Sequence, residues 1–592
     1  MKTYAVDFET SYTKDRSIGT HGTLGYLSHP DTDIFMVAVV GEGIQYVGPP
    51  QDAPWDLVRG QRVIAHNYSF EWAAFRECER RGIIKEPLNE TGFCSANLAA
   101  YLQAPRNLLG ASQELLGIQL DKTTRDKFKN KNFHTLPDAI KEEIAGYALM
   151  DAKACYMLWE KFRHLWPEHE QLLSAHTTLM GHRGISANEE AIENGIRTYK
   201  EILWGLEKLI PWAGTNPVLS LPQLRDACRK AGIPAPESTA KDDEDFQVWA
   251  DTYADKVPFV AAVSQYRSTN RSLNVLEAMQ IRTLEGRVRY GLKYCGAVPT
   301  FRWSGDAGLN VQNFPREPVG GIDIRTMFEA PAGRSFISAD MSQIEPRIAL
   351  WLTGNTTQLE KIRQGMCVYE VHARQTMRYN LDISLKEAAK KDEEYANMRQ
   401  AAKARVLGLS YGQYSRGFQA YAKTFGLELT LEQADFQVTQ FRSKNPLLTA
   451  FWDSLELGLR QSRGKSLELD NPNGRKMKYF DVTIGRNPKG FPDYRARTVM
   501  GGVPTYYTSG KLFNNCCQGI ARDVFAEKIT EIEYKLGLPV CLTVHDEVLV
   551  EVDAADAKDA QREITRVMAT SPEWMPDIPL ASDCNIMQAY EK

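Results

Sequence analysis

One short stretch near the carboxyl end limits the fold of this chain more than any other. Residues 541–550 read CLTVHDEVLV, so two adjacent acids, Asp546 and Glu547, lie between apolar runs that are typical of paired β-strands. The pattern predicts a hairpin with Asp546 at its tip. An ionised carboxylate among apolar strands costs free energy unless a positive group meets it, although a solvated turn would also explain the two acids. The stretch alone is consistent with a surface turn and also with a charged functional centre.

The composition limits the class of protein. The 592 residues are 43% hydrophobic and 25% charged, which predicts a globular chain of more than one domain and argues against disorder, collagen or a coiled coil. No apolar run is long enough to cross a bilayer, and the first residues, MKTYAVDFET, lack the apolar core of a secretory leader. Ten scattered cysteines, without CxxC or Cys/His metal spacing, indicate a reducing, cytoplasmic location.

Local charge is more informative than the net charge of −4. Residues 395–425 contain five Arg or Lys and no acid, and residues 267–302 contain seven Arg or Lys against two Glu. Basic stripes on a nearly neutral chain suit a cleft that holds an anionic polymer. Two solvated helix faces would explain the same charges.

Strand and helix patterns alternate along the first part of the chain. The strand-like run YAVDFET and the run RVIAHNYSFEWAAF are followed by a helical pattern that ends near residue 165, which predicts an α/β domain. Mostly helical patterns continue to about residue 290, and a long helical stretch runs from about Gln358 to Phe425. The remaining segments mix strands and helices, so the chain is predicted to be a multidomain α/β protein.

A strand followed by a helix places another acid at a junction. The run SFISAD predicts a strand and SQIEPRIALWL a helix, so Asp340 lies where one gives way to the other. Ser342 and Glu345 have the spacing of a capping box, and Pro346 falls in the first turn, where proline is tolerated. A simple strand-end aspartate explains Asp340 equally well when it is considered alone.

Arg399, Lys403, Leu407 and Tyr411 follow one another at steps of four. On a helix they form one slowly turning stripe. Two cations and an aromatic ring on one face are suited to a triphosphate and a base. An ordinary amphipathic surface is the alternative.

The N-terminal segment has its own set of acids. Asp7 and Glu9 are two apart on the predicted first strand and so face the same side. Glu71 lies in HNYSFEW, and Tyr147 and Asp151 are four apart on one helix face. Each acid alone is explained by a solvated surface.

Three motifs, in order and with matching spacing, resemble those of the DNA polymerase I family, family A. They are DMSQIEPR at 340–347, RQAAKARVLGLSYG at 399–412 and VHDE at 544–547. The runs TFRWSG and QNFPR within 300–316, and KLFNNCCQGIARD at 511–523, also resemble family positions. The resemblance covers roughly residues 285–592 and makes a chance match very improbable.

The resemblance assigns roles to these residues. Asp340 and Asp546 would share two Mg²⁺ ions, with Mn²⁺ as an alternative, and Glu547 would support them. The implied nucleotide contacts are Arg399 and Lys403 for the phosphates, Tyr411 and Leu407 for the base and sugar, and Glu345 for exclusion of a 2′-hydroxyl. The implied contacts to primer–template DNA are Arg302, Asn514, Gln518 and His545.

The N-terminal acids resemble the 3′–5′ proofreading exonuclease of the same family. Asp7 and Glu9 match its DxE motif, and Tyr147 with Asp151 matches YxxxD. Residues 67–71 match NxxxD except that Glu71 replaces the aspartate, so its backbone is expected to retract or its site to be weaker. Asp7, Glu9, Glu71 and Asp151 would be metal ligands, and Tyr147 would orient the attacking water.

Four positions depart from the family pattern. Leu407 replaces a usual aromatic residue, Met341 a tyrosine, Pro346 an apolar residue and Phe301 a glycine. These changes leave the predicted metal and phosphate ligands intact. They make sugar selection the property that the resemblance predicts least well.

The implied architecture is an RNase H-like exonuclease domain followed by a right-hand polymerase. The domains would be the exonuclease at 1–165, the thumb at 166–285, the palm at 286–355 and 441–592, and the fingers at 356–440. Because the proofreading strand begins at Tyr4, no 5′-nuclease module is expected before it. The compact size resembles phage members of the family, which implies a phage-encoded protein in the cytoplasm of a bacterial host.

The implied function is a template-directed DNA polymerase, a nucleotidyltransferase that extends a primer with deoxynucleoside triphosphates and proofreads by 3′–5′ exodeoxyribonuclease activity. A single-subunit RNA polymerase is one alternative, against which the exonuclease acids and Glu345 argue. A catalytically inactive DNA-binding protein is the other, against which the joint presence of Asp340, Asp546, Arg399 and Lys403 argues. The sequence identifies neither a processivity factor nor a helicase partner, and no membrane partner is expected.

Overall fold

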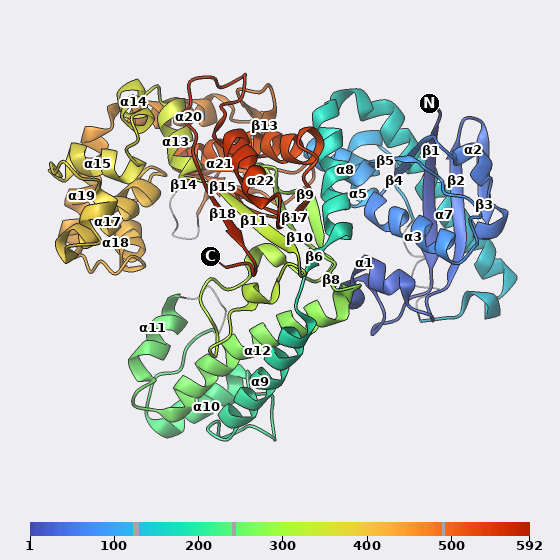
Figure 1. Ribbon diagram of the computed structural model, residues 1–592, viewed down its shortest axis with the longest axis horizontal. Coiled ribbons are helices and arrows are strands. Elements are labelled where there is room, and N and C mark those ends of the chain that lie inside the picture. The colour runs from blue at the N-terminus through green and yellow to red at the C-terminus, as the bar shows by residue number, and fades with distance from the viewer. Residues whose placement is uncertain (122–129, 239–243, 488–489, 491, 592) are drawn as a thin grey trace.

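The computed structural model describes residues 1–121, 130–238, 244–487, 490 and 492–591. Over the described residues, an α/β domain at the N-terminus, layers of helices and four further sheets make up the molecule (Figure 1). Within these described ranges, no helix is both long and apolar enough to cross a membrane. The fold is thus mixed α/β, as the alternating patterns predict.

The N-terminal domain is built on a five-stranded sheet in the order β3-β2-β1-β4-β5. β1 (Thr3–Thr10) pairs antiparallel with β2 and parallel with β4. Long helix α7 (Asp138–Phe162) contacts β1 and β2. The other strands of the sheet are β2 (Ile34–Gly41), β3 (Ile44–Gly48), β4 (Arg62–Ala65) and β5 (Thr91–Cys94). The same domain contains the helices α1 (Ile18–Ser28), α3 (Tyr68–Arg80) and α4 (Ser95–Tyr101).

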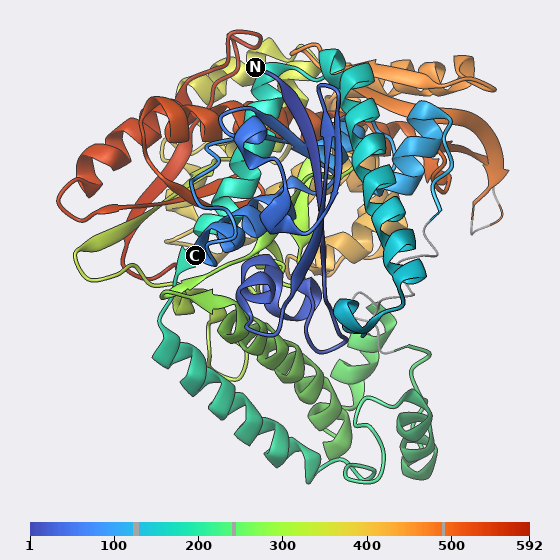
Figure 2. The same ribbon diagram turned by 90° about the vertical axis from the view of Figure 1, so that its right-hand side faces the viewer.

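Helices follow the first domain. α9 and α12 pack side by side and, with α10 and α11, project from the rest of the molecule (Figures 1 and 2). α8 instead packs against β5, β9, β16 and α21, and so joins the N-terminal domain to the centre. The bounds are α8 (Glu168–Arg183), α9 (Glu189–Glu207), α10 (Leu221–Ala231), α11 (Glu244–Tyr253) and α12 (Pro258–Arg282).

The central sheet has the strand order β16-β17-β11-β18, with every neighbouring pair antiparallel. α22 packs against β11, β17 and β18. The predicted hairpin over residues 541–550 is confirmed as β16 and β17, and the predicted strand–helix junction as β11 and α13. The bounds are β11 (Arg334–Met341), α13 (Ile344–Leu352), α21 (Ser509–Thr530), β16 (Val540–Val544), β17 (Glu547–Asp553), α22 (Ala557–Ala569) and β18 (Ser582–Met587).

The long helical stretch predicted from Gln358 to Phe425 is helical but not continuous. Turns divide it, and the segment Arg405–Leu409 has π-helical hydrogen bonds. These helices gather on the side of the molecule away from the N-terminal domain (Figure 1). Their bounds are α14 (Thr356–Arg363), α15 (Val368–Thr376), α16 (Leu385–Ala388), α17 (Glu393–Ala404), α18 (Ser415–Lys423), α19 (Leu431–Lys444) and α20 (Pro446–Gln461).

Three more sheets occur in the described residues, one of which joins β6 (Ile185–Ser186), β8 (Arg287–Val288) and β7 (Thr283–Leu284) in that order. β9 (Gly291–Ala297) pairs with β10 (Arg302–Asp306), and four further strands form the order β12-β13-β14-β15. One continuous apolar core links Trp159 of the N-terminal domain to Tyr294 of β9 and Phe336 of β11. The bounds of the four strands are β12 (Leu467–Asp470), β13 (Lys476–Arg486), β14 (Pro492–Arg497) and β15 (Thr505–Tyr507).

Candidate active sites

The central sheet brings Asp340 and Asp546 together from distant parts of the sequence. β11 and β17 pair so that Asp340 lies opposite Glu547, the residue after Asp546. The amide of Met341 donates a hydrogen bond to the Asp546 carbonyl at 3.1 Å. The turn between β16 and β17 contains only two residues, and His545 adopts a left-handed conformation there with φ 56°. A short turn and a fixed register therefore hold both aspartates at one edge of the sheet.

Glu547 is buried beneath this edge. One of its carboxylate oxygens accepts a hydrogen bond from Ser338 Oγ at 2.5 Å, and the other accepts one from the Tyr590 hydroxyl at 2.9 Å. Burial and the neighbouring Glu547 carboxylate raise the pKa of Tyr590, so this phenol stays protonated and donates. Both oxygens of Glu547 are engaged, which suits a residue that supports the edge from below.

The first turn of α13 differs from the prediction. The capping box predicted from Ser342 and Glu345 does not form, because Gln343 is the N-cap residue and has a left-handed backbone. Ser342 instead donates to Asp583 at 3.2 Å, and Glu345 forms an ion pair with Arg302 of β10. A capping box uses only local spacing, whereas these partners come from other strands.

The predicted stripe from Arg399 to Tyr411 is only partly helical. α17 carries Arg399 and Lys403, half-buried Leu407 lies in the π-helical segment, and Tyr411 lies in the turn beyond it. Burial, and then repulsion from Arg399, lowers the pKa of Lys403. Two crowded cations on one helix face suit an anion that would relieve their repulsion.

Tyr411 packs its ring against Phe513 of α21, with the centroids 6.2 Å apart. Burial raises the pKa of Tyr411 well above its usual value. Its hydroxyl and the Nε of Arg399 are buried and have no hydrogen-bond partner among the described residues. Buried polar groups are normally satisfied, so both atoms suit a site that is completed by a polar ligand.

The predicted DNA contacts lie on neighbouring elements. Asn514 and Gln518 are one turn apart on α21, and Gln518 Nε2 donates to Asn514 Oδ1 at 3.3 Å. α21 contacts β10, which carries Arg302. His545 is exposed in the hairpin turn beside Asp546. The fold thus places Arg302, Asn514 and Gln518 on two elements that contact each other, and His545 next to Asp546.

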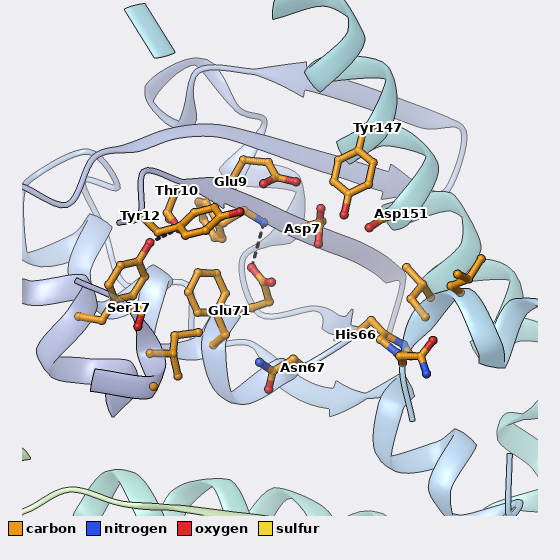
Figure 3. Close-up of a pocket in the computed structure, with 18 residues that line it drawn as sticks. Asp7, Glu9, Thr10, Tyr12, Ser17, His66, Asn67, Glu71, Tyr147 and Asp151 are labelled. Atoms are coloured by element: carbon orange, nitrogen blue, oxygen red, sulfur yellow. Dashed lines mark hydrogen bonds between the residues drawn. The ribbon is translucent and has the colours of Figure 1, made fainter. Parts of the chain in front are cut away.

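A second cluster of acids lines a cavity of about 650 Å³ in the N-terminal domain (Figure 3). Asp7 and Glu9 come from β1, Glu71 comes from α3, and Tyr147 and Asp151 come from α7. In Figure 3 the Tyr147 hydroxyl and Asp151 point toward Asp7. The structure therefore brings all five predicted residues of this segment to one cavity.

Glu71 lies in the first turn of α3 and contacts β1. Its carboxylate turns toward β1 and accepts a hydrogen bond from the Phe8 amide at 3.1 Å (Figure 3). Burial, and then the nearby Asp7 carboxylate, raises the pKa of Glu71 well above its usual value. Carboxylates crowded in this way are stabilised by a divalent cation, which fits hard oxygen ligands.

His66 and Asn107 are among the polar residues that line this cavity without a role predicted from the sequence. The His66 ring nitrogens lie 2.9 Å from Ser95 Oγ and 2.8 Å from the Arg106 carbonyl. Asn107 lines the cavity from the N-cap of a short helix. A single His or Asn in the sequence carries no spacing signal, so only the tertiary structure reveals them.

Neither site forms a complete metal shell from protein side chains alone. In the described part of the chain, no three His, Cys, Asp or Glu side chains are grouped as a metal site. Mg²⁺ is typically held by one or two carboxylates together with water and substrate phosphates. The donor chemistry of Asp340 with Asp546, and of the N-terminal acids, fits that mode of binding.

Comparison with known proteins defines first the class and then the family. A solved structure, the POL domain of Pol1 from M. smegmatis in complex with DNA primer-template and dNTP, shares this fold with a TM-score of 0.69 and 17% identity, covering 99% of this chain and 95% of that one. The molecule thus has a polymerase fold, with paired aspartates at its central sheet. The model for DNA polymerase family A matches residues 220–592, more than half of the sequence, so the chain belongs to that family.

Two curated relatives show how far the similarity extends. The DNA polymerase of Bacillus phage SP02 is 23% identical over the whole of both chains. DNA polymerase I of Aquifex aeolicus is 26% identical over 58% of this chain. The matched region covers about half (52%) of the length of that relative. The family predicted from the three motifs is therefore confirmed, and the full-length similarity to a phage protein agrees with the phage-like size.

Proposed function

We propose that this family A polymerase extends a DNA primer with deoxynucleoside triphosphates and removes misplaced 3′ ends in its N-terminal domain. The observation that carries the proposal is the register of β11 and β17, which places Asp340 and Asp546 at one edge. The similarity to a phage polymerase supports a phage-encoded enzyme that acts on primer–template DNA in the cytoplasm of its bacterial host. We assign 1–165 to an RNase H-like exonuclease, 166–285 to the thumb, 286–355 and 441–592 to the palm, and 356–440 to the fingers.

In the polymerase site, Asp340 and Asp546 would hold two Mg²⁺ ions, or Mn²⁺ in their place. At both sites, bound divalent ions supply charge that activates an attacking oxygen and neutralises a leaving one. Arg399 and Lys403 bind the triphosphate, and Tyr411 lies against the nascent base pair. Glu345, held by Arg302, occupies the space that a 2′-hydroxyl would need.

In the exonuclease site, Asp7, Glu9, Glu71 and Asp151 would hold the metal ions. Tyr147 orients the water that attacks the terminal phosphodiester, because its hydroxyl points into the same cavity (Figure 3). Differences in binding between right and wrong substrates supply only about 1–3 kcal/mol, so a second, editing site raises accuracy beyond what selection alone provides.

One set of primer assays tests both activities. With Mg²⁺ and a matched primer, we expect the wild type to add deoxynucleotides, and with a mismatched primer to remove the 3′ end first. Asp546→Ala should lose extension, by at least about 100-fold, while primer–template affinity and 3′ removal remain. Asp7→Ala should lose 3′ removal and keep extension.

Each variant is the control for the other. Normal extension by Asp546→Ala would contradict the polymerase assignment, and the absence of any 3′ removal by the wild type would contradict the exonuclease assignment. Equal use of ribonucleotides and deoxynucleotides would favour a single-subunit RNA polymerase. Primer binding without extension would favour an inactive DNA-binding protein.

A further inference from the structure

Phe301 has a backbone conformation that a phenylalanine rarely adopts. It lies in the turn between β9 and β10, where its amide donates to the Ala297 carbonyl at 2.9 Å, and its φ is 62°. A bulky side chain is strained in this left-handed region, which glycine enters freely. Phe301 is nonetheless fully buried, at 0% exposure. Such strain persists only where the surrounding contacts fix the residue.

The ring of Phe301 is held between two side chains. The guanidinium carbon of Arg475 lies 4.2 Å from the ring centroid, and the ring of Tyr101 lies edge-on at 5.8 Å. Both arrangements attract the ring, the first as a cation–π contact and the second as a T-shaped aromatic pair. Tyr101 is the last residue of α4, and α4 packs against β9, so one of the two contacts comes from the N-terminal domain.

Arg475 is a rigid support for this ring. Its Nε and Nη2 donate to the carboxylate of Asp523 at 3.0 and 2.9 Å, and Nη2 also donates to the Gly519 carbonyl at 3.0 Å. The pair is buried, with side-chain exposures of 3% and 1%. A buried, bidentate ion pair fixes the guanidinium plane. Gly519 adjoins Gln518, so the support is continuous with the helix that carries the proposed DNA contacts.

The residue after Phe301 belongs to the proposed nucleotide site. Arg302 begins β10 and forms the ion pair with Glu345 of α13. The conformation of Phe301 therefore determines where the Arg302 backbone leaves the turn. Tyr101, Phe301, Arg302 and Glu345 form one chain of contacts from the N-terminal domain to the site at the central sheet.

We propose that Phe301 is a positioning residue through which docking of the N-terminal domain holds Arg302 and Glu345 in place and so sets the selection of deoxynucleotides. The inference rests on the proposed polymerase function. Displacement of a site residue by about 1 Å costs up to roughly 100-fold in rate. Loss of either ring contact is therefore expected to weaken discrimination between deoxynucleotides and ribonucleotides. It removes no group that is proposed to touch the metals or the phosphates.

The test uses the full chain with Asp7→Ala in every sample, so that editing does not affect the measurement. The kcat and KM are measured separately for one deoxynucleotide and for its ribonucleotide opposite the same template base. Phe301→Gly and Tyr101→Ala should each lower the ratio of the two kcat/KM values by about tenfold, within the range that a small displacement produces. Tyr101→Phe keeps the ring and should retain the wild-type ratio.

Thermal unfolding separates positioning from stability. Tyr101→Phe preserves the packing and should remain folded at the assay temperature, whereas Phe301→Gly removes the backbone strain but leaves a cavity where the buried ring packed. If Phe301→Gly does not fold, the matched Tyr101 variants still decide the question. An unchanged ratio in Tyr101→Ala, with normal use of deoxynucleotides, would overturn this inference alone. Failure of the parent protein to extend any primer would instead overturn the proposed function.

Discussion

At the scale of single residues, two adjacent acids of one hairpin have different surroundings. Asp546 is half-buried at the tip of the hairpin, whereas Glu547 is buried and accepts hydrogen bonds from Ser338 and Tyr590. A carboxylate with both oxygens engaged is a poor candidate for a permanent metal ligand. We infer that Asp546 acts in the reaction and that Glu547 fixes the edge on which it acts.

The variant Glu547→Gln tests this division of roles. It keeps the volume but replaces one acceptor by a donor, so we expect unfolding to become easier by about 1–2 kcal/mol. Extension should fall less than in Asp546→Ala. Denaturant unfolding and single-turnover extension measure the two effects, and Tyr590→Phe, which removes one donor, is the matched control. A Glu547→Gln protein of unchanged stability that is as inactive as Asp546→Ala would show that Glu547 is a metal ligand.

The difference between these two acids could not be predicted from the sequence. The pattern of CLTVHDEVLV predicts the hairpin correctly, because alternation and turn residues are local signals. Ser338 and Tyr590, by contrast, reach Glu547 only through the pairing of distant strands and the end of the chain. The same limit applies to Glu71, whose contact with the Phe8 amide depends on how α3 meets β1.

At the scale of elements, α8 connects the N-terminal domain to the centre through a neutral histidine. The ring of His182 stacks on Trp72 of α3 with the centroids 4.5 Å apart, and its Nε2 lies 3.0 Å from the Ser69 carbonyl. Burial, and then the positive charge of Arg289, lowers the pKa of His182 to about 4. The folded protein therefore favours the uncharged ring, although the hydrogen bond to Ser69 acts in the opposite direction.

This contact predicts a dependence of stability on pH. Because the pKa of His182 is about 4 in the folded state and about 6.5 when unfolded, the unfolded chain binds more protons between these values. The contribution is complete above about pH 6.5 and is lost as the pH falls toward 4. From pH 7 to pH 5 the wild type should lose about 2 kcal/mol more than His182→Gln. Urea unfolding at both pH values measures the difference, and equal losses in the two proteins would contradict the assignment.

Helix prediction at this scale succeeds where periodicity is the main cause of structure. The prediction of helix between Gln358 and Phe425 is confirmed, but the prediction of one long stretch is wrong. Turns and the π-helical segment at Arg405–Leu409 divide the stretch, and these breaks follow from packing. The predicted capping box at Ser342 fails for a similar reason. The Ser342 hydroxyl donates a hydrogen bond to Asp583 on β18, so a tertiary contact replaces the local one.

At the scale of the whole molecule, the two proposed sites belong to one packed body. An apolar core runs from the N-terminal domain into the central sheet, and buried Gln103 connects that domain to β13 across more than 370 residues. Its side chain donates to the carbonyls of Lys478 and Thr498 and accepts from the Lys478 amide. No motif marks Gln103, and the run TFRWSG contains Phe301 without indicating its contacts with Tyr101 and Arg475, so only the structure shows how the domains dock.

The central claim is that Asp340 and Asp546 jointly hold the divalent ions that support primer extension. The most direct test is the extension rate of Asp340→Cys and Asp546→Cys in Mg²⁺ and in Cd²⁺. A thiolate is a softer ligand than a carboxylate, so we predict that both variants are inactive in Mg²⁺ and regain extension in Cd²⁺. Extension by either variant at the wild-type rate in Mg²⁺ would contradict the claim.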